Sequence, residues 1–387
     1  MKVVALSTSG YPIGPSPMVG RLHCYMKALK ESGNDVRVIV TTSDSDSSDG
    51  VFDDIKYTKV IIPKVTGHFF KRKKWRNVRN NILETYLRDC DVFYTSEDTI
   101  ESLNSLIDLT KKMGCKIVIE LNEYPYCIPG RFDSRLVFRM KQWVYLNKTL
   151  PKVDGVIAIS HALYDLAIGR VKDEKKVIRI PILSKTDFVA RKAEKADTPY
   201  MLHISPSLSE QKDGIKTVFK AFAEANRQMD GKFNFILTSK VAKPSLRKWV
   251  DSFIRDNNLS DNVIFTGLVS NEKVDELLDG CSLAVLNKPS NIQNDYNFPT
   301  KLTNLLPRAI PVIISDTGEI PYFFEDGRNA FVFHADDEHQ LAHRMVYVLK
   351  HPAEAEKIGE EGRQLAIKHF YYKNQVEPLN AFIKNLK

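Results

Sequence analysis

The sequence predicts an α/β protein built from two Rossmann-like domains, each with a parallel sheet. Short apolar runs alternate with longer helical patterns along the whole chain, and this alternation occurs twice over similar lengths. The 387 residues suit two or more domains at roughly 150 residues each. Strands separated by helices form right-handed βαβ units, and such units build parallel sheets.

The first half shows this alternation from its first residues. The helix expected at 19–32 has apolar residues at spacings of three and four, which form one stripe. They are Val19, Leu22, Met26 and Leu29. Gly33 follows, where a glycine commonly ends a helix. We expect strands at 2–7, 35–41, 91–95, 116–121 and 156–160, and helices at 19–32, 72–89, 97–113 and 133–150.

The second half repeats the scheme after a connecting segment, 171–199, which contains a strand-like run at 177–180. The end, 352–386, is helical in pattern, with a bend expected at 370–372. We therefore place the domains at 1–184 and 185–369, followed by a last helix at 370–387. We expect strands at 200–204, 233–238, 262–266, 282–286, 310–314 and 330–333, with helices such as 213–229 and 244–257 between them.

Composition narrows the class of protein. Lys plus Arg is 56 against 48 for Asp plus Glu, a net charge of +8 that suits an anionic ligand or membrane surface without demanding nucleic acid. The five cysteines are scattered without CxxC spacing, so we expect neither a zinc site nor a disulfide framework, and a cytoplasmic location. The first residues lack the features of a signal peptide, and no apolar run approaches 18 residues.

A dinucleotide-dependent dehydrogenase would also alternate strands and helices. The first loop, 7–20, lacks the G-x-G-x-x-G fingerprint of that class. An acid follows the second strand at Asp44, where a ribose-binding residue would lie. Without the glycines this acid is weak support, and we set the dehydrogenase aside.

The segment 294–316 is the most informative part of the chain. It consists of a polar loop, a helix start, a short amphipathic helix and a buried strand. A loop that enters a helix beside the carboxyl end of a parallel strand is where α/β proteins bind phosphorylated ligands. We therefore expect the amides of 300–302 to face an anion.

Within this segment, Phe298-Pro299-Thr300-Lys301 and the later Pro311-Val312-Ile313 resemble the pattern F-P-[ST]-K-x-x-E-Y-x-A-x-G-x-P-V-I. That pattern belongs to the retaining glycosyltransferases of the GT-B fold (family-4 type, glycosyl transferases group 1). The resemblance extends over the second half, at 200–205, 212–215, 262–267, 316–318 and 326–330. It implies two domains that face each other across a cleft and a last helix that crosses back to the first domain.

The resemblance also implies a reaction. A sugar would pass from a nucleoside diphosphate sugar, such as a UDP-sugar, to a glycan or lipid-linked acceptor, as in bacterial polysaccharide and glycolipid biosynthesis. Retention, no metal and no other cofactor are expected. In the family, the lysine that matches Lys212 contacts the diphosphate, so we assign it a catalytic role. The residues expected to bind the donor are Gly14, Ser207, Lys212, Lys240, Gly267, Asp295, Tyr296, Thr300, Lys301 and Asn304.

One departure from the family pattern concerns carboxylates. The helix glutamate that accepts hydrogen bonds from the ribose is replaced by Asn304, and the earlier glutamate falls at Tyr296, beside Asp295. A neutral acceptor is weaker than a charged one by roughly 1 kcal/mol. Two hypotheses follow: an enzyme with altered donor binding, or a catalytically inactive paralogue that serves as a binding or partner subunit.

In the first domain, the strand at 116–121 leads into Asn122 and Glu123. The family carries a similar acidic turn that faces the donor sugar, so we expect Glu123 to be a catalytic acid near the acceptor. The alternative, that Glu123 only caps the following segment, stays open. Retaining members are described as using front-face attack, so Glu123 need not be a nucleophile.

Two segments combine cations with aromatic residues. Residues 69–79 contain six cations and no acid, and the helix at 131–152 is also basic. We expect them on the acceptor side, against an anionic membrane surface. A solvated basic face is the alternative, and no nucleic-acid-binding motif accompanies them. The nine histidines form no metal-ligand pattern. The candidate membrane residues are Lys73, Lys74, Trp75 and Arg76.

Overall fold

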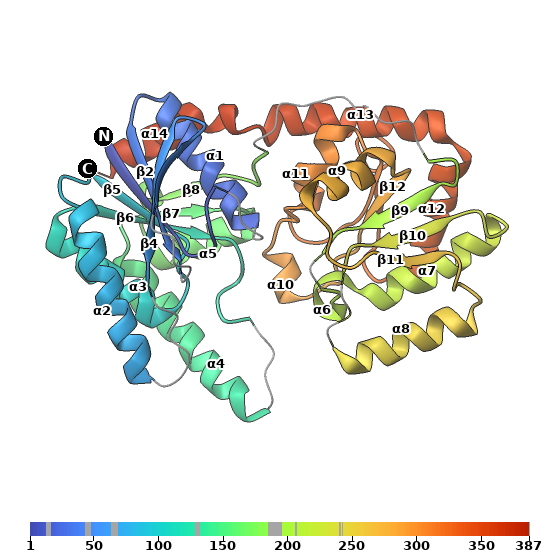
Figure 1. Ribbon diagram of the computed structural model, residues 1–387, viewed down its shortest axis with the longest axis horizontal. Helices are drawn as coiled ribbons and strands as arrows, with labels where there is room; N and C mark the ends of the chain where they lie inside the picture. Colours follow the sequence, from blue (N-terminus) through green and yellow to red (C-terminus); the bar gives the residue numbers. More distant parts are fainter. Residues whose placement is uncertain are drawn as a thin grey trace. The chain divides into compact units, whose positions relative to one another are not determined.

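The structure is a computed structural model that describes residues 1–12, 17–42, 48–62, 69–127, 132–184, 196–205, 207–239, 241 and 243–386. The chain forms two compact units. Unit 1 contains Met1–Lys185 and Tyr371–Lys387, and unit 2 contains Thr186–Phe370. Each unit has one sheet with helices packed around it (Figure 1).

The sheet of unit 1 has the strand order β3-β4-β2-β1-β5-β6-β7-β8. All neighbours are parallel except β3 and β4. The chain order reverses between β1 and β5, and the carboxyl ends of two such strands form a topological switch point. The strands are β1 (Lys2–Ser7), β2 (Asp35–Thr42), β3 (Ser48–Phe52), β4 (Ile55–Ile61), β5 (Val92–Thr95), β6 (Lys116–Leu121), β7 (Gly155–Ala158) and β8 (Val177–Arg179).

The β3–β4 hairpin is an element that the sequence analysis missed. Asp53 and Asp54 form its turn with φ of 48° and 62°. Two successive positive φ angles define the type I′ turn, which favours Asp, Asn and Gly. Phe52 and Ile55 pair with each other across the hairpin. The Asp-Asp pair between them was therefore a sequence signal for a two-residue hairpin turn.

The helices expected at 19–32, 72–89 and 97–113 match observed helices to within a few residues, and the helix at His161–Val171 was not expected. The helix expected at 133–150 is α-helical only to Val144. It continues as a π-helical turn at Tyr145–Thr149 and a 3-10 helix at Leu150–Lys152. The α-helices of this unit are α1 (Pro17–Glu31), α2 (Phe69–Tyr86), α3 (Ile100–Met113), α4 (Phe132–Val144), α5 (His161–Val171) and α14 (Val376–Asn385).

The last helix, α14, packs on unit 1. Asn34 Nδ2 donates to Asn380 Oδ1 at 3.0 Å, and Tyr372 Oη donates to Glu31 Oε1 at 2.7 Å. Leu386 lies so close to β7 that a Cβ at Gly155 would be 2.7 Å from its Cδ1. These contacts make the C-terminal segment part of the first unit's core.

The sheet of unit 2 has the order β11-β10-β9-β12-β13-β14, with every neighbouring pair parallel. The order reverses between β9 and β12, so their carboxyl ends form the switch point of this unit. The strands are β9 (Tyr200–His203), β10 (Asn234–Leu237), β11 (Val263–Phe265), β12 (Leu283–Leu286), β13 (Val312–Ser315) and β14 (Phe331–Phe333).

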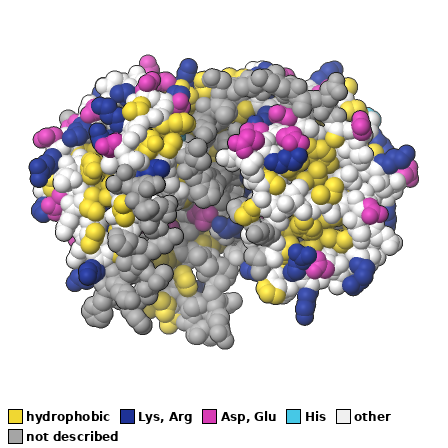
Figure 2. All heavy atoms as spheres, in the orientation of Figure 1, with side chains coloured by type: hydrophobic (Ala, Val, Ile, Leu, Met, Phe, Trp, Pro, Cys, Tyr) yellow, Lys and Arg dark blue, Asp and Glu magenta, His cyan; other side chains and the backbone are white. Residues whose placement is uncertain are grey.

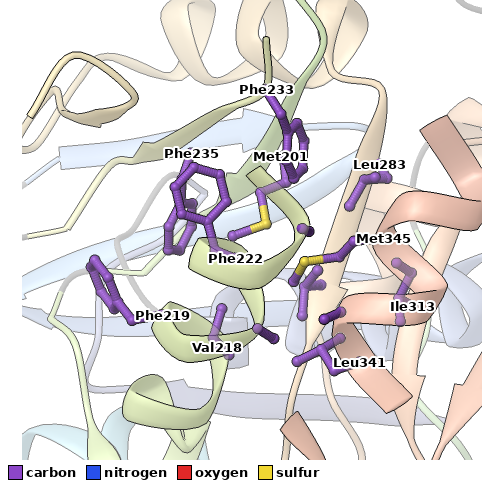
Figure 3. Close-up of a cluster of buried hydrophobic side chains, with 14 of the residues drawn as sticks. Met201, Val218, Phe219, Phe222, Phe233, Phe235, Leu283, Ile313, Leu341 and Met345 are labelled. Atoms are coloured by element: carbon purple, nitrogen blue, oxygen red, sulfur yellow. The ribbon is translucent and has the colours of Figure 1, made fainter. Parts of the chain in front are cut away.

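A cluster of buried aromatic and aliphatic side chains fixes the helices of unit 2 on their sheet (Figure 3). The ring centres of Phe219 in α7 and Phe235 in β10 are 5.3 Å apart, and those of Phe222 and Phe233 are also 5.3 Å apart. This packing holds the start of α7 beside the switch point. The α-helices are α6 (Glu210–Asp213), α7 (Ile215–Gln228), α8 (Pro244–Asp256), α9 (Asn271–Gly280), α10 (Ile292–Asp295), α11 (Leu302–Leu305), α12 (Glu338–Lys350) and α13 (Pro352–His369).

Candidate functional site

Four charged or titratable side chains meet at the switch point of unit 2. Asp213 ends α6, His203 ends β9, and Lys288 follows β12. Lys288 Nζ donates to Asp213 Oδ1 at 3.0 Å. Lys301 Nζ, from the segment 294–316, lies 3.6 Å from the same oxygen. One buried carboxylate therefore pairs with two lysines.

Backbone contacts hold this cluster in place. Gly214 has φ of +50°, and a Cβ there would lie 2.3 Å from Asn287 Nδ2, so the position requires glycine. Asn287 Nδ2 donates to the Gly214 carbonyl at 3.1 Å, which ties α6 to the end of β12. The Lys288 amide donates to Ser315 Oγ at 2.8 Å. The turn after β9 and the ends of β12 and β13 are thereby linked.

The ionisation of the cluster follows from its burial and charges. Burial would raise the pKa of Asp213, but Lys301 and Lys288 together hold it well below its usual range. Burial lowers the pKa of Lys301 to about 8, and the nearby Lys288 acts in the same direction. Burial and Lys301 lower the pKa of His203 to about 3, so this imidazole is neutral near pH 7.

Three buried polar atoms at this edge of the sheet have no hydrogen-bond partner among the described residues. They are His203 Nδ1, Ser239 Oγ and Asn287 Oδ1, which follow or end the adjacent strands β9, β10 and β12. A buried polar atom without a protein partner is costly, and such atoms commonly contact a bound ligand or water. Their common location indicates a binding site at this edge.

A small pocket opens in the same place. It has a volume of about 30 Å³, which is room for roughly one water molecule. Its polar lining residues are His203, Lys301 and Asn304, and Leu202, Ile204 and Leu286 are among its apolar ones. Lys301 keeps 28% of its side chain exposed, so a ligand at the edge can reach it.

Two predicted residues, Lys301 and Asn304, therefore lie together at the pocket. Lys212 lies next to Asp213 with an exposed side chain, and its carbonyl accepts from Lys288 Nζ at 3.0 Å. Ser207 is exposed in the turn after β9, and Gly267 has φ of +70° after β11. Gly14 and Lys240 lie outside the described residues.

The expected row of open amides at 300–302 was wrong in part. The helix that follows, α11, has a single turn, and the Leu302 amide already donates to the Pro299 carbonyl at 3.1 Å. The Leu302 amide is therefore not open to a ligand. The lysine ammonium groups are a cationic feature that the structure shows directly.

The loop with Asp295 and Tyr296 packs tightly against the turn after β13. Asn291 caps α10, with its Oδ1 accepting from the amides of Gln293 and Asn294. Gly318 has φ of +63°, and a Cβ there would be 2.5 Å from the Asn294 carbonyl oxygen. Burial raises the pKa of the Asp295 carboxyl. This loop is therefore held by backbone packing.

In unit 1, acidic residues gather at the carboxyl ends of β5 and β6. Glu123 is exposed and Asn122 half-buried in the loop after β6. Burial, Glu97 and Glu123 all raise the pKa of Asp98, which places these three carboxyls near one another. Glu123 thus lies in an acidic group at the switch-point edge of its sheet.

The sequence analysis missed a buried hydrogen-bond network around Glu120 of β6, three residues before Glu123. Arg21 Nε donates to Glu120 Oε1 at 2.8 Å, and Tyr25 Oη donates to the same oxygen at 2.9 Å. Tyr94 Oη donates to Glu120 Oε2 at 3.3 Å. Both partners of the ion pair are buried, so Glu120 has a structural role in attaching α1 to the sheet.

The candidate membrane residues lie on α2. Lys73 and Lys74 are exposed, whereas Trp75 and Arg76 are half-buried. Among the side chains that Figure 2 colours by type, Lys and Arg are interspersed with Asp and Glu. In the described ranges, no three His, Cys, Asp or Glu side chains are grouped to hold a metal ion, and no helix is long and apolar enough to cross a membrane.

Comparison with a protein-family model identifies the second unit. Residues 185–365 match the model described as glycosyl transferases group 1, a range that covers nearly all of unit 2. Unit 2 matches a glycosyl transferases group 1 domain, and the protein is a glycosyltransferase. No curated protein shows a significant match to the sequence.

Solved structures resemble this glycosyltransferase over its whole length. HepE of Anabaena, solved with UDP and glucose, has a TM-score of 0.69 and 16% identity, with 99% of this chain and 98% of that chain covered. Sucrose-phosphate synthase of Thermosynechococcus elongatus has a TM-score of 0.72 and 16% identity, with 100% and 98% covered. A variant of TarM of S. aureus, solved with UDP, has a TM-score of 0.71 and 11% identity, with 100% and 99% covered. The chain has their GT-B fold.

Three residues of the cluster in this glycosyltransferase domain were missed from the sequence. Asp213 was expected at the start of a helix, His203 inside a strand, and Lys288 was not singled out. The resemblance covered 200–205 and 212–215 and so reached two of them. The position of His203 at the carboxyl end of a strand beside the switch point was the available signal for a site residue.

Proposed function

We propose that this glycosyltransferase takes its sugar from a nucleoside diphosphate sugar, a UDP-sugar, bound at the carboxyl edge of the unit 2 sheet. The observation that carries the proposal is the cluster of Lys288 and Lys301 around Asp213, beside unpaired buried polar atoms. Two lysines exceed one carboxylate by one positive charge, and a diphosphate would supply negative charge.

The residues of the cluster suit the chemistry of the leaving group. When the bond between the sugar C1 and the diphosphate oxygen breaks, negative charge develops on the diphosphate, and prearranged cations stabilise it. Lys301 and Lys288 are suited to this role, and Lys212 is exposed beside them. Neutral His203 offers one nitrogen as donor or acceptor to a ligand. No step requires a metal ion.

We further propose that the sugar is transferred with retention. The acceptor hydroxyl oxygen bonds to C1 on the face that the diphosphate leaves, and its proton passes to the departing phosphate oxygen. The acceptor, a glycan or lipid-linked saccharide, binds on unit 1, where Glu123 stands in an acidic group with Glu97 and Asp98. This group attracts neither phosphate, so it suits the neutral hydroxyls of an acceptor.

A cytoplasmic location is part of the proposal. None of the described cysteines forms a disulfide, and Cys24, Cys90, Cys115 and Cys281 are buried. Free buried thiols are usual in a reducing compartment.

The competing hypothesis is an inactive paralogue that binds the nucleotide as a partner subunit, because Asn304 replaces a carboxylate. In the structure, Asn304 lines the same pocket as His203 and Lys301. This location supports a role for Asn304 as a neutral acceptor in the donor site. We favour an active enzyme with weakened ribose contacts.

The decisive experiment measures donor binding and turnover separately. The full chain is mixed with UDP, GDP and a panel of nucleotide sugars, and melting temperature and sugar hydrolysis are recorded. We expect a thermal shift with UDP and slow hydrolysis of at least one UDP-sugar. No shift with any nucleotide contradicts the donor site. A shift without turnover, even with acceptor extracts, supports the partner subunit.

Retention is tested on the product. With an accepted donor and acceptor pair, proton NMR of the new glycosidic linkage reports its anomeric configuration. We expect the configuration of the donor. An inverted product would overturn front-face transfer while leaving the donor site intact. Chelator treatment before the assay should leave the rate unchanged.

A further inference from the structure

The outward face of α4 is apolar, although it faces solvent. Leu136, Val137, Met140 and Trp143 are exposed to 66%, 51%, 61% and 57%. Successive residues of an α-helix are about 100° apart, so these four side chains share an arc of about 120°. Large apolar side chains scattered singly on a surface are ordinary, but a contiguous exposed set marks a docking surface.

The opposite face of the same helix attaches it to unit 1. Gln142 Nε2 donates to the Pro125 carbonyl at 2.8 Å, and Phe138 is half-buried. One turn further on, Tyr145 and Leu146 are buried. The helix therefore buries one face in its own unit and presents a second apolar face to solvent, which core packing alone does not explain.

Cations border the exposed stripe. Arg139 and Lys141 are exposed and fall on either side of it at about 100° per residue. Lys148 Nζ lies over the Trp143 ring, 5.7 Å from its centre. From Ser134 to Val153 the sequence has no Asp or Glu. A partner that binds this surface must therefore offer both an apolar region and negative charge.

The basic helix α2 extends in the same direction. In Figure 1, α2 and α4 both reach past the sheet of unit 1 at the same end. Lys73 and Lys74 of α2 are exposed, and the sequence has no acid from Phe69 to Leu83. Two helices thus contribute positive charge to one end of the unit.

We propose that the exposed face of α4 docks on an anionic membrane, with its apolar side chains in the lipid interface and its cations among acidic headgroups. Helices with an apolar stripe flanked by Lys and Arg bind such interfaces, and each cation near the surface adds attraction. A second copy of this chain fits less well, because pairing α4 with itself would oppose like charges. Exposed aliphatic side chains also do not suit nucleic-acid bases.

Vesicle co-sedimentation of the full chain tests the proposal. We expect binding to vesicles of phosphatidylcholine with phosphatidylglycerol, weak binding to phosphatidylcholine alone, and loss at high salt. The double variant Met140→Gln, Trp143→Gln should reduce the partition coefficient at least tenfold. The control variant Val51→Gln, Leu268→Gln removes side chains of similar exposure (65% and 63%) elsewhere and should change it less than twofold. Equal loss in both variants would overturn the docking site.

Tryptophan fluorescence gives an independent measurement. Lipids brominated in the acyl chain should quench emission of the wild-type chain, and Trp143→Phe should abolish most of that quenching. Absence of Trp143 quenching despite binding would overturn insertion of the apolar face.

Light scattering after gel filtration tests whether a second copy of the chain binds this face instead. A dimer in the wild type that the α4 variant dissociates would assign this face to a second copy. UDP binding should be unchanged in all variants, which separates this result from the donor site.

Discussion

Asp213 and Lys288 lie 75 residues apart in the chain and form a buried ion pair, with Nζ 3.0 Å from Oδ1. Lys301 shares the carboxylate, so the cluster carries one more positive than negative charge. A cluster of this kind is both a structural contact between distant loops and a site poised for an anion.

Replacing Asp213 by Asn should destabilise unit 2 and strengthen its response to nucleotide. Removing one partner of a buried pair leaves charge uncompensated, and we expect a loss of about 3 kcal/mol, or roughly a 6–12 °C fall in Tm. A diphosphate would replace the missing negative charge, so the Tm increase with UDP should exceed that of the wild type. Thermal unfolding with and without UDP measures both effects.

The matched control is Asp251→Asn. Asp251 pairs with Arg247 at 2.8 Å, but both side chains are about half exposed. Exposed pairs contribute little, so the change should stay within about 0.5 kcal/mol. If UDP stabilises the Asp213 variant less than the wild type, the diphosphate does not bind beside this carboxylate.

Donor affinity should fall as pH rises through about 8, because the Lys301 ammonium, whose pKa burial lowers to about 8, loses its charge there. Lys301→Gln should remove this pH dependence and weaken UDP binding roughly tenfold at pH 7, since a hydrogen bond to a charged group contributes about 1.5 kcal/mol or more. Isothermal titration calorimetry between pH 6.5 and 9 provides the test. Lys248→Gln, on the exposed surface of α8, is the control, and an unaltered profile in the Lys301 variant would exclude this lysine.

Acid should destabilise the protein partly through His203. Its folded-state pKa, about 3, lies below the ordinary 6.5, so the unfolded chain binds the proton more tightly between these values. Stability is then lost as pH falls through this window, by about 2 kcal/mol between pH 7 and 5 from this group. His203→Gln should lose correspondingly less in urea titrations at the two pH values. His339→Gln leaves His203 in place and should keep the wild-type difference; equal losses in all three proteins would contradict the prediction.

Gly318→Ala should disturb the loop that carries Asp295 and Tyr296. The new Cβ would meet the Asn294 carbonyl oxygen at 2.5 Å, in addition to the cost of a positive φ. Gly231→Ala isolates that second cost, about 1–2 kcal/mol, because it has φ of +72° and no atom within 4 Å of the added Cβ. We expect the Gly318 variant to lose more stability than the control and to bind UDP more weakly. Identical behaviour of the two variants would show that the loop tolerates the contact.

Asn304→Glu should strengthen UDP-sugar binding roughly fivefold, because a charged acceptor exceeds a neutral one by about 1 kcal/mol. Asn304 is exposed at the pocket, so a longer side chain can be accommodated. Asn304→Gln controls for side-chain length and should leave affinity near that of the wild type. Weaker binding in the Glu variant would mean that this position faces the phosphates rather than the ribose.

The strands were largely predictable because a parallel strand covered on both faces is a continuous apolar run. The edge hairpin β3–β4 was missed because its strands are not continuous apolar runs: in β4, exposed Lys56 lies between buried Ile55 and Thr58. The surroundings of α4 were also left open: its sequence was compatible with a membrane-facing surface and with a solvated basic face. Only the structure shows that Leu136 and Met140 lie on the solvent side.

By itself, the sequence determined the two α/β halves, the family pattern around Lys301 and the missing carboxylate at Asn304, because these depend on residue types at short spacing. The tertiary structure decided which groups share an environment. Asp213, Lys288 and Lys301 come from three separate segments. Only folding brings both lysine Nζ atoms within 4 Å of Asp213 Oδ1. The depressed pKa of Lys301 and the unpaired nitrogen of His203 follow from burial, which no local pattern encodes.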